Sequence, residues 1–369
     1  MTSTRSVVSK GRAVLLVRVV IVVVALWLAA VPLPRELVEG VYAQGIYPIV
    51  RQLVTGLSSR TTLVLFDWLL VAGVTGLFGW WCWRLTRAGR KRRLRVLLLL
   101  VGRTLVLAAA LYVAFLSIWG LNYRRQSLTS RLDYVEKRLN VAELESVTAV
   151  GVDRLNKLYG SIEAETWPQL NDLPDKLGPA FVRVQQRLGV SLPTPGLIPR
   201  RSILTPYFRR AGIDGMLDPF FLQVLINDTV LPFERPFVTA HEWAHVAGYA
   251  HEAEANFVAW LSCLEGDDLM QYSGWVYLVG RLLNALPESS RSSFVDRIGS
   301  GPQADFAAVR ARLSRVVPVV QRSARRINDQ YLRANRVSSG VASYAEVVQL
   351  VVGTDMGRRQ WSQTSSSSE

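Results

Sequence analysis

Two histidines four residues apart frame a glutamate in the stretch His241-Glu242-Trp-Ala-His245. All three histidines of the 369-residue chain lie between residues 241 and 251. On a helix, positions i and i+4 share a face, so His241 and His245 can present two imidazole nitrogens to one tetrahedral metal ion such as Zn2+. Glu242 lies beside them, where its carboxylate could take a proton from water without binding the metal itself. This spacing predicts metal-assisted hydrolysis with Glu242 as the catalytic residue.

A third protein ligand has to come from beyond this helix, because catalytic zinc sites usually take three ligands from the protein and leave the fourth position to water. Gly248 is expected to end the helix in a left-handed conformation that reverses the chain. Three possible ligands follow it, namely His251, Glu252 and Glu254. His251 completes the spacing His-x-x-x-His-x-x-Gly-x-x-His, in which a glycine turn returns a third histidine to the metal.

Glu254 is favoured among the three by a burial argument. A second helix is predicted at about residues 251–264, and Glu254 shares its apolar face with Phe257, Val258 and Leu261. A carboxylate on that face is costly unless it is paired or bound to metal. The predicted metal set is therefore His241, His245 and Glu254, whereas Glu252 falls on another face, where it could orient a histidine.

Three apolar segments precede the domain that carries the motif. They cover about residues 13–31, 61–83 and 94–121, and each is long enough to cross a bilayer as a helix. A cleaved signal peptide is the less favoured alternative for the first, because two further apolar runs follow it. Residues 32–60 mix apolar and charged side chains and predict an amphipathic segment on the outer surface. Asp67 and Arg103, inside the second and third segments, could pair with each other or reach the membrane surface.

Charge distribution predicts the orientation. Seven basic residues lie between residues 84 and 95, in the loop between the second and third segments. By the positive-inside rule this loop is cytoplasmic. The prediction is a multi-pass protein of the cytoplasmic membrane with a cytoplasmic N-terminus and an extracytoplasmic C-terminal domain.

The overall composition fits this topology. Half of the residues are hydrophobic and the formal net charge is +14. Because the basic clusters adjoin apolar segments and lack interleaved aromatic residues, membrane topology explains them and no nucleic-acid partner is expected. The only cysteines, Cys82 and Cys263, imply neither a disulfide framework nor a cysteine-rich metal site. The expected partners are the lipid bilayer and a peptide or protein substrate outside the cytoplasm.

The predicted fold class is mainly α, with a membrane domain at residues 1–121 and a mostly helical zincin-like domain at 122–357. Periodicity and turn residues predict two helices within 131–159, a short helix at 181–188, a strand at 220–226, a core helix at 275–286, a long helix at 306–331 and a disordered tail at 358–369. By analogy with zincin-type hydrolases, the strand before the metal-binding helix would line the cleft and pair with extended substrate.

Several short motifs together resemble a known family of proteins. They are Gly120-Leu-Asn-Tyr123 at the end of the third apolar segment, Glu252-Ala-Glu-Ala-Asn-Phe257 after the histidines, Tyr272-Ser-Gly274, the run from Asn328 to Asn335 and the run from Gly340 to Tyr344. Over nearly its whole length the chain resembles the bacterial multi-pass membrane proteins grouped as domain-of-unknown-function family 3810. That family's pattern does not require a histidine at position 251, so the resemblance favours Glu254 over His251 and implies a gluzincin-like site. The stretch from Phe220 to Asn227 is more apolar than the family's usual pattern.

The function predicted from these observations is a membrane-anchored, zinc-dependent metallopeptidase. Tyr272 and Tyr331 are candidates for stabilising the oxyanion that forms when water attacks a carbonyl, although tyrosines often only pack. The alternative is a non-enzymatic membrane protein in which structural zinc supports a sensor or partner-binding module. Glu242 argues against that alternative, because a structural zinc site prefers four protein ligands and has no need of a base.

Overall fold

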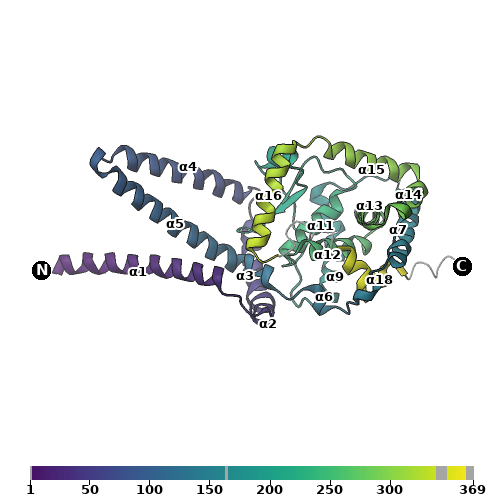
Figure 1. Ribbon diagram of the computed structural model, residues 1–369, viewed down its shortest axis with the longest axis horizontal. Helices are drawn as coiled ribbons and strands as arrows, with labels where there is room; N and C mark the ends of the chain where they lie inside the picture. The colour runs from purple at the N-terminus through teal and green to yellow at the C-terminus, as the bar shows by residue number, and fades with distance from the viewer. Residues whose placement is uncertain (1, 163–164, 338–346, 363–369) are drawn as a thin grey trace.

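Three long apolar helices project from a mostly helical body in the computed structural model (Figure 1). The structure describes residues 2–162, 165–337 and 347–362. The projecting helices are α1 (Thr2–Ala30), α4 (Leu65–Thr86) and α5 (Arg93–Ile118). The stretches Arg12–Ala30, Leu65–Thr86 and Arg90–Ile118 are long and apolar enough to cross a membrane, and almost none of their residues are buried within the protein. The predicted three apolar spans are therefore confirmed.

The segment between α1 and α4 forms α2 (Arg35–Leu37), the π-helix η1 (Val38–Ile46) and α3 (Tyr47–Ser58). This is the segment that we predicted to be amphipathic, and in the structure it buries Glu39, Tyr42, Tyr47 and Arg51. The guanidinium of Arg51, for example, donates to the carbonyl of Leu192. Because buried polar groups need partners, this segment packs as a layer between the apolar helices and the body.

The first turn of α4 is fastened to the body through Asp67. Its carboxylate accepts hydrogen bonds from Ser202 Oγ at 2.5 Å and from the backbone N–H of Ile203 at 2.9 Å. Arg103 instead stacks over the ring of Trp80, with its guanidinium 5.8 Å from the ring centroid. Asp67 and Arg103 therefore do not pair with each other, because the body supplies donors to Asp67.

The body is built around α12 (Glu252–Leu264), whose residues from Glu252 to Cys263 are all buried. Helices α9, α11 and α13 pack around it, and α7 covers α13. The short 3-10 helix η2 (Arg90–Arg92) lies in the turn between α4 and α5, away from the body. The remaining elements of the body are η3 (Gly120–Arg124), α6 (Leu128–Arg131), η4 (Glu136–Arg138), α7 (Val141–Ile162), η5 (Leu170–Asp172), α8 (Leu173–Lys176), α9 (Gly178–Arg187), α10 (Thr205–Ala211), α11 (Arg235–Val246), α13 (Asp268–Ala285), α14 (Glu288–Arg297), α15 (Ser300–Leu313), α16 (Pro318–Ala334), α17 (Val347–Gly353) and α18 (Asp355–Ser362). The prediction of a mainly α fold is therefore confirmed.

A small antiparallel sheet consists of β1 (Gly215–Leu217) and β2 (Val224–Ile226), with Gly215 opposite Ile226. The predicted strand at 220–226 is therefore correct only for its last three residues. Leu222 just before β2 has a φ of 53°, a left-handed conformation that interrupts an extended chain.

Three further helical predictions differ from the structure in their boundaries. The long helix expected at 306–331 is two helices, because Pro318 begins α16 after Val317 in an extended conformation. Residues 131–159 hold one long helix, α7, preceded by short turns. In the tail, α18 continues to Ser362, while residues 363–369 and the motif from Gly340 to Tyr344 lie outside the described residues.

Candidate metal centre

The helices α11 and α12 form a hairpin that turns at Gly248. Gly248 has a φ of +93°, as the sequence predicted for this turn. A Cβ added there would lie 2.9 Å from both Arg125 Nη1 and Asn122 Oδ1, so the position needs glycine for space as well as for conformation. His251 has an extended conformation and precedes the first turn of α12. The hairpin thereby sets the start of α12 against the C-terminal half of α11.

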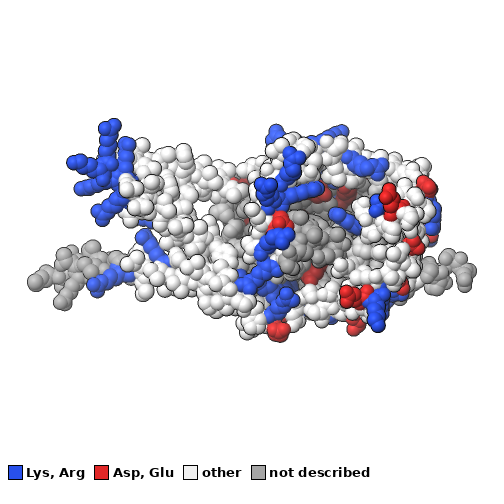
Figure 2. Space-filling view, in the orientation of Figure 1, with Lys and Arg blue, Asp and Glu red and all other residues white. Residues whose placement is uncertain are grey.

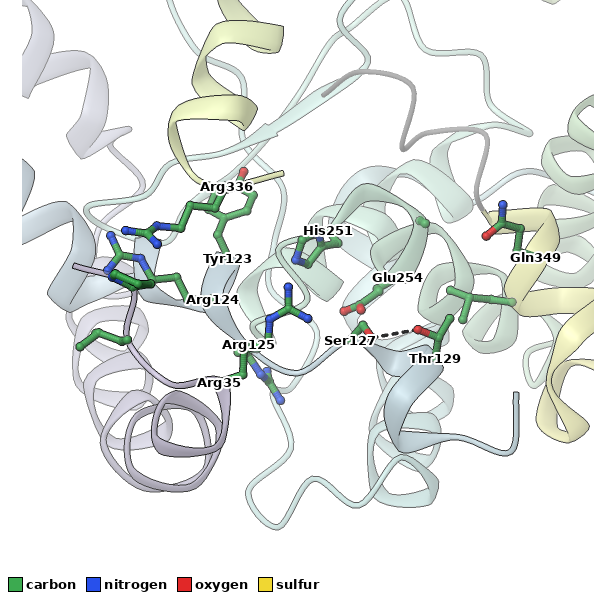
Figure 3. A pocket seen from close by; sticks show the side chains of 14 residues that line it. Arg35, Tyr123, Arg124, Arg125, Ser127, Thr129, His251, Glu254, Arg336 and Gln349 are labelled. Atoms are coloured by element: carbon green, nitrogen blue, oxygen red, sulfur yellow. Dashed lines mark hydrogen bonds between the residues drawn. The ribbon is translucent and has the colours of Figure 1, made fainter. Parts of the chain in front are cut away.

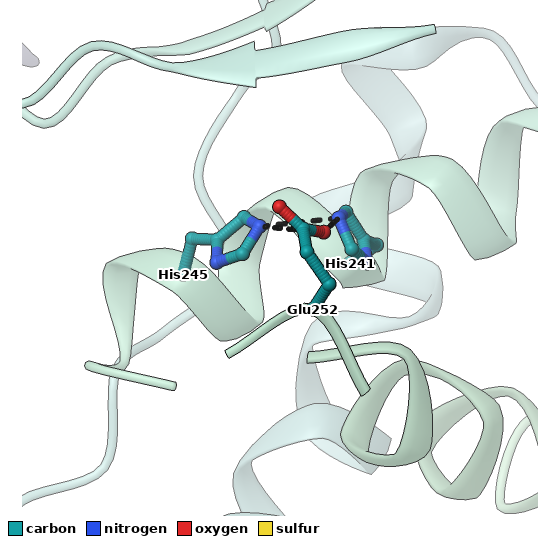
Figure 4. Close-up of side chains that lie close together, drawn as sticks. All are labelled: His241, His245 and Glu252. Carbon is teal, nitrogen blue, oxygen red and sulfur yellow. Dashed lines mark hydrogen bonds and ion pairs between the residues drawn. The ribbon is translucent and has the colours of Figure 1, made fainter. Parts of the chain in front are cut away.

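Three side chains from this hairpin meet, namely His241, His245 and Glu252 (Figure 4). The two Nε2 atoms of the histidines are 3.1 Å apart. Glu252 Oε2 lies 3.2 Å from His241 Nε2 and 3.6 Å from His245 Nε2. His245 and Glu252 are buried, whereas His241 is partly exposed. Among the described residues, this is the group of histidine, cysteine and acidic side chains that could hold a metal ion.

These distances fit a shared tetrahedral ion. Two ligand atoms about 2.1 Å from a zinc ion lie about 3.4 Å from each other at the tetrahedral angle. The observed separations of 3.1, 3.2 and 3.6 Å bracket that value. Three protein ligands leave one coordination position for a water or a substrate atom.

A backbone carbonyl sets the orientation of His245. Its Nδ1 lies 2.8 Å from the carbonyl oxygen of Tyr249, so Nδ1 carries the proton and donates it in the neutral ring. The lone pair is then on Nε2, the atom that faces His241 and Glu252. Burial lowers the pKa of His245, but the adjacent Glu252 carboxylate outweighs that effect and raises the pKa to about 9, so without a cation the ring also binds a proton on Nε2, which a metal ion would displace.

For Glu252 the same two effects act on the pKa in the opposite directions. Burial raises its pKa, but the two histidines outweigh burial and hold the pKa of this carboxyl well below its usual range. Glu252 is therefore ionised in the folded protein. An anionic oxygen facing two imidazole nitrogens is a suitable cation ligand.

Glu242 is buried one residue along α11, with 3% of its surface exposed. Its Oε2 has no hydrogen-bond partner in the structure. Burial raises the pKa of Glu242. The strand pair passes directly above the three-residue cluster (Figure 4), and a Cβ at Gly215 of β1 would lie only 2.6 Å from Glu242 Oε1. Glycine at this position lets the strand backbone approach the carboxylate.

The structure places Glu254 away from the two histidines. Its Oε1 accepts a hydrogen bond of 2.7 Å from the backbone N–H of Leu128, at the start of α6. The sequence argument correctly gave Glu254 a buried position, but all faces of α12 are buried, so burial could not distinguish Glu254 from Glu252. Two residues along a helix turn a side chain by about 200°, and it is the first residue of α12 that meets α11. The cluster thus contains Glu252 in the place where we expected Glu254.

His251 and the two expected tyrosines also lie outside the cluster. The ring of His251 packs edge-on against Tyr123, with centroids 6.1 Å apart. Tyr272 donates a 2.6 Å hydrogen bond to Asp305 Oδ2. Tyr331 packs against Tyr123 and Phe115, although the charge of Glu252 contributes to its raised pKa, after burial. Of the two, only Tyr331 is within electrostatic reach of the cluster.

Sequence reasoning missed Tyr277 of α13. Its ring stacks on Phe237 with centroids 3.7 Å apart, and the ring of Phe237 in turn stacks on His241 at 6.5 Å. Burial, together with the charge of Glu252, raises the pKa of Tyr277 to about 12. The apolar helical stretch at 275–286 predicted that this region is core, and nothing local in the sequence indicated that it faces the histidines.

The C-terminal end of α11 is capped by residues that flank the apolar helices. The carbonyl of Val246 accepts a hydrogen bond of 2.6 Å from Tyr47 Oη, and the carbonyl of His245 accepts one of 2.9 Å from Trp119 Nε1. Arg125 Nη1 donates to the carbonyl of Gly248 at 3.1 Å, and Arg125 Nη2 pairs with Glu39 Oε1 at 2.8 Å. The last carbonyls of a helix lack partners within the helix, so these contacts stabilise the turn that carries His245.

Comparison with known proteins gives one match. A family model described as "Protein of unknown function (DUF3810)" matches residues 42–352. No curated protein and no solved structure matches the chain. The matched region includes the second half of η1, α3, two of the apolar helices and the whole of the histidine-bearing hairpin.

Proposed function

The chain belongs to the DUF3810 family of proteins of unknown function, and from its site we propose that it is a membrane-anchored, zinc-dependent peptidase. His241, His245 and Glu252 would hold the zinc ion, and Glu242 would act as the general base. The observation that carries the proposal is the trio of ligand atoms, all within 4.8 Å of one another, beside a buried carboxylate that lacks a partner.

The donor set suits zinc in a catalytic setting. Two imidazole nitrogens and one carboxylate oxygen are a ligand combination found in zinc hydrolases, and a three-ligand set leaves a position open. When bound, zinc supplies Lewis acidity that polarises a carbonyl and makes water a nucleophile near neutral pH. A structural zinc site has no use for Glu242 and prefers four protein ligands, so the enzyme is favoured over a sensor with structural zinc.

Glu242 has the properties of a general base. Its Oε2 has no partner and would accept a proton from a water that attacks the substrate carbonyl. Its raised pKa brings it closer to the range in which a carboxyl group both accepts and returns a proton. Returning that proton to the leaving amine would complete hydrolysis of an amide bond.

The edge of β1 supports a peptide as substrate. The pairs Asp214–Asn227 and Asp218–Gln223 are hydrogen-bonded across the hairpin. Because hydrogen-bonded pairs alternate in an antiparallel ladder, the N–H and C=O groups of Gly215 and Leu217 point away from β2. In the described part of the chain no other strand pairs with this edge. An extended peptide could add to it as a strand, directly above Glu242.

We place the site outside the cytoplasm. The far end of the α4–α5 hairpin carries a dense group of Lys and Arg side chains (Figure 2), in the loop from Arg84 to Arg95. The positive-inside rule makes that end cytoplasmic, and the body lies at the other end of the same helices. The substrate would then be a peptide or an envelope protein at the outer surface of the cytoplasmic membrane.

The test combines metal content with peptide cleavage in purified full-length protein. Wild type should carry about one zinc per chain by elemental analysis and cleave members of a peptide library. Glu242→Gln should keep the zinc and lose at least about a hundredfold in cleavage rate, because general base catalysis contributes about 10²–10⁴-fold. Glu254→Gln is the matched control, since its partner is the backbone of Leu128.

Two results would contradict the proposal. Wild type that binds no zinc would remove the ligand assignment. A Glu242→Gln protein that keeps its zinc and cleaves peptides like wild type would remove the enzymatic role. If no peptide in the library is cleaved although zinc is bound, the non-enzymatic alternative with structural zinc becomes the better reading of the site.

A further inference from the structure

A pocket of about 320 Å3, separate from the metal cluster, lies where α1 and α5 meet the body. One part of its wall is the chain just after α1, with Arg35, and the chain just after α5, with Arg124 and Arg125 (Figure 3). The facing part includes His251 and Glu254, next to the first turn of α12. This volume is in the range of about 300–1,000 Å3 that is typical of small-molecule sites.

The wall of this pocket is strongly cationic. It contains Arg35, Arg124, Arg125 and Arg336, against a single acidic side chain, Glu254. Arg125 is neutralised by Glu39 at 2.8 Å. None of the ion pairs in the described parts of the chain joins Arg35, Arg124 or Arg336 to a carboxylate. Three of the four arginines that line the pocket therefore have no carboxylate as a counter-charge.

Arg124 is the arginine of this site that is both buried and held in place by a hydrogen bond. Only 7% of its surface is exposed, and its Nη2 donates to the carbonyl of Leu28 at 2.8 Å. Its Nη1 is buried and has no hydrogen-bond partner. Burial lowers the pKa of Arg124 and the like charge of Arg336 lowers it further, whereas the hydroxyl of Tyr112 partly opposes both. A buried, unsatisfied donor beside a like charge is costly unless an anion is bound.

Hydrogen bonds to the C-terminal end of α1 use only some of the N–H donors of these arginines. Arg124 and Arg336 donate to the carbonyls of Leu28 and Ala29 in the last turn of α1, a favourable place for cations at a helix C-terminus. Each contact engages one nitrogen, and a guanidinium has five N–H donors. Arg35 has no such contact and is exposed. These contacts leave Arg124 Nη1 and the guanidinium of Arg35 available to an anion in the pocket.

The location indicates where the anion comes from. The pocket begins where α1 ends at Ala30 and α5 ends at Ile118, the level at which the apolar helices leave the bilayer. Helix α16 on the same side of the body exposes Val319 and Ile327, which are 64% and 63% accessible, among its arginines. Lys and Arg side chains gather along this side of the body (Figure 2). An amphipathic basic helix is typical of an anionic membrane surface.

We propose that this pocket binds the phosphate of an anionic phospholipid headgroup, with Arg35, Arg124 and Arg336 as donors. Guanidinium groups bind phosphate oxygens in a bidentate manner, and basic pockets beside membrane helices bind anionic headgroups. The acyl chains would lie along the apolar surfaces of α1 and α5. This site is separate from the metal cluster and does not depend on the proposed hydrolysis.

The test uses full-length protein in phosphatidylcholine nanodiscs that contain a minority of phosphatidylglycerol. Lipids that remain after extraction are counted by native mass spectrometry. Wild type should retain phosphatidylglycerol in preference to phosphatidylcholine. Arg35→Gln should lower this retention about fivefold and Arg35→Gln with Arg336→Gln about 25-fold, from about fivefold for each basic residue at an anionic surface.

Control variants distinguish a loss of lipid retention at this site from an effect of overall charge and from unfolding. Arg154→Gln on α7 removes one positive charge at the far end of the body and should leave retention unchanged. Arg35→Gln breaks no contact that holds the fold, so its loss cannot be attributed to unfolding. Arg124→Gln should also lose retention, and its thermal unfolding shows whether the contact to α1 has been lost as well.

Three results would overturn the proposal. Equal retention of phosphatidylglycerol and phosphatidylcholine by wild type would show that the pocket does not select an anionic lipid. Unchanged retention in the double variant would show that these arginines are not its donors. If inorganic phosphate raises the unfolding temperature of detergent-purified protein and phosphatidylglycerol does not, the ligand is a soluble phosphate and the lipid assignment is wrong.

Discussion

The first turn of α12 contributes to two sites of opposite character. Glu252 faces His241 and His245 of α11, where ligand atoms with lone pairs converge and a cation is favoured. Glu254, two residues later, faces the backbone of Leu128 in a pocket where arginines dominate and an anion is favoured. The two side chains are chemically identical, so the residues that other segments bring to each face decide what each carboxylate does.

The largest expected effect separates these two glutamates. Glu252→Gln should weaken zinc binding by more than about a hundredfold, because it replaces an anionic ligand with a neutral one, and even loss of a partner behind a ligand costs about 10–100-fold. Glu254→Gln should change zinc affinity by less than about threefold, since its oxygen still accepts from Leu128. Competition with a chromophoric chelator measures both. Equal losses in the two variants would mean that the comparison between the two faces is mistaken.

Local patterns in the sequence predicted the parts of the site that lie within one or two turns of chain. The spacing of His241 and His245, the turn at Gly248 and the three apolar helices depend on neighbours along the chain, and the structure has all of them. Each rests on helical periodicity, on the special conformation of glycine or on the thickness of a bilayer.

The choice between Glu252 and Glu254 could not be made in this way. The hydrogen bond that engages Glu254 comes from Leu128, 126 residues away, and the whole surface of α12 is buried. Periodicity identifies a buried face only when another face is exposed. The burial of the segment from η1 to α3 was missed for the same reason, because Tyr47 finds its partner 199 residues further along, at Val246.

Gly248 lies between the two sites, and a substitution there should affect both. Gly248→Ala should destabilise the protein by about 3 kcal/mol, from a left-handed φ and from close contacts with Arg125 and Asn122. Thermal unfolding in detergent measures this as a lowered midpoint. Gly160→Ala in α7 is the control, since a Cβ there meets nothing and alanine favours helix by about 1 kcal/mol. If the unfolding midpoint of Gly248→Ala were as high as that of Gly160→Ala, the turn would not require glycine at position 248.

The hairpin of β1 and β2 lies against Glu242 and does not line the arginine pocket, and Asp218 gives it a pH dependence. Burial raises the pKa of Asp218 to about 6, although the backbone N–H groups of Phe220 and Phe221 donate to its carboxylate. The folded protein therefore binds more protons than the unfolded chain between about pH 4 and 6. Its free energy of unfolding falls as pH rises through this window, by on the order of 2 kcal/mol from this group.

Asp218→Asn should remove that pH dependence. The difference in unfolding midpoint between Asp218→Asn and wild type should shift in favour of the variant as pH rises from 4 to 6.5. Retention of phosphatidylglycerol should stay as in wild type at each pH, because the hairpin does not line the arginine pocket. A midpoint difference that is constant with pH would show that Asp218 is already ionised at pH 4.

The smallest effect tests whether the residue next to the arginine pocket also supports the metal cluster. Trp119→Phe keeps the ring that packs edge-on against His245 and removes the N–H that donates to the His245 carbonyl at 2.9 Å. Zinc affinity should fall about fivefold, as expected from the loss of one neutral hydrogen bond behind a metal ligand. Trp81→Phe loses a comparable bond, to Thr104 in the apolar helices, and should leave zinc affinity unchanged. Lipid retention should be the same in both variants, because neither ring lines the pocket. If Trp119→Phe lowered lipid retention as strongly as zinc affinity, the two faces of α12 would act as one coupled unit, and their separate assignment to a cation and an anion would fail.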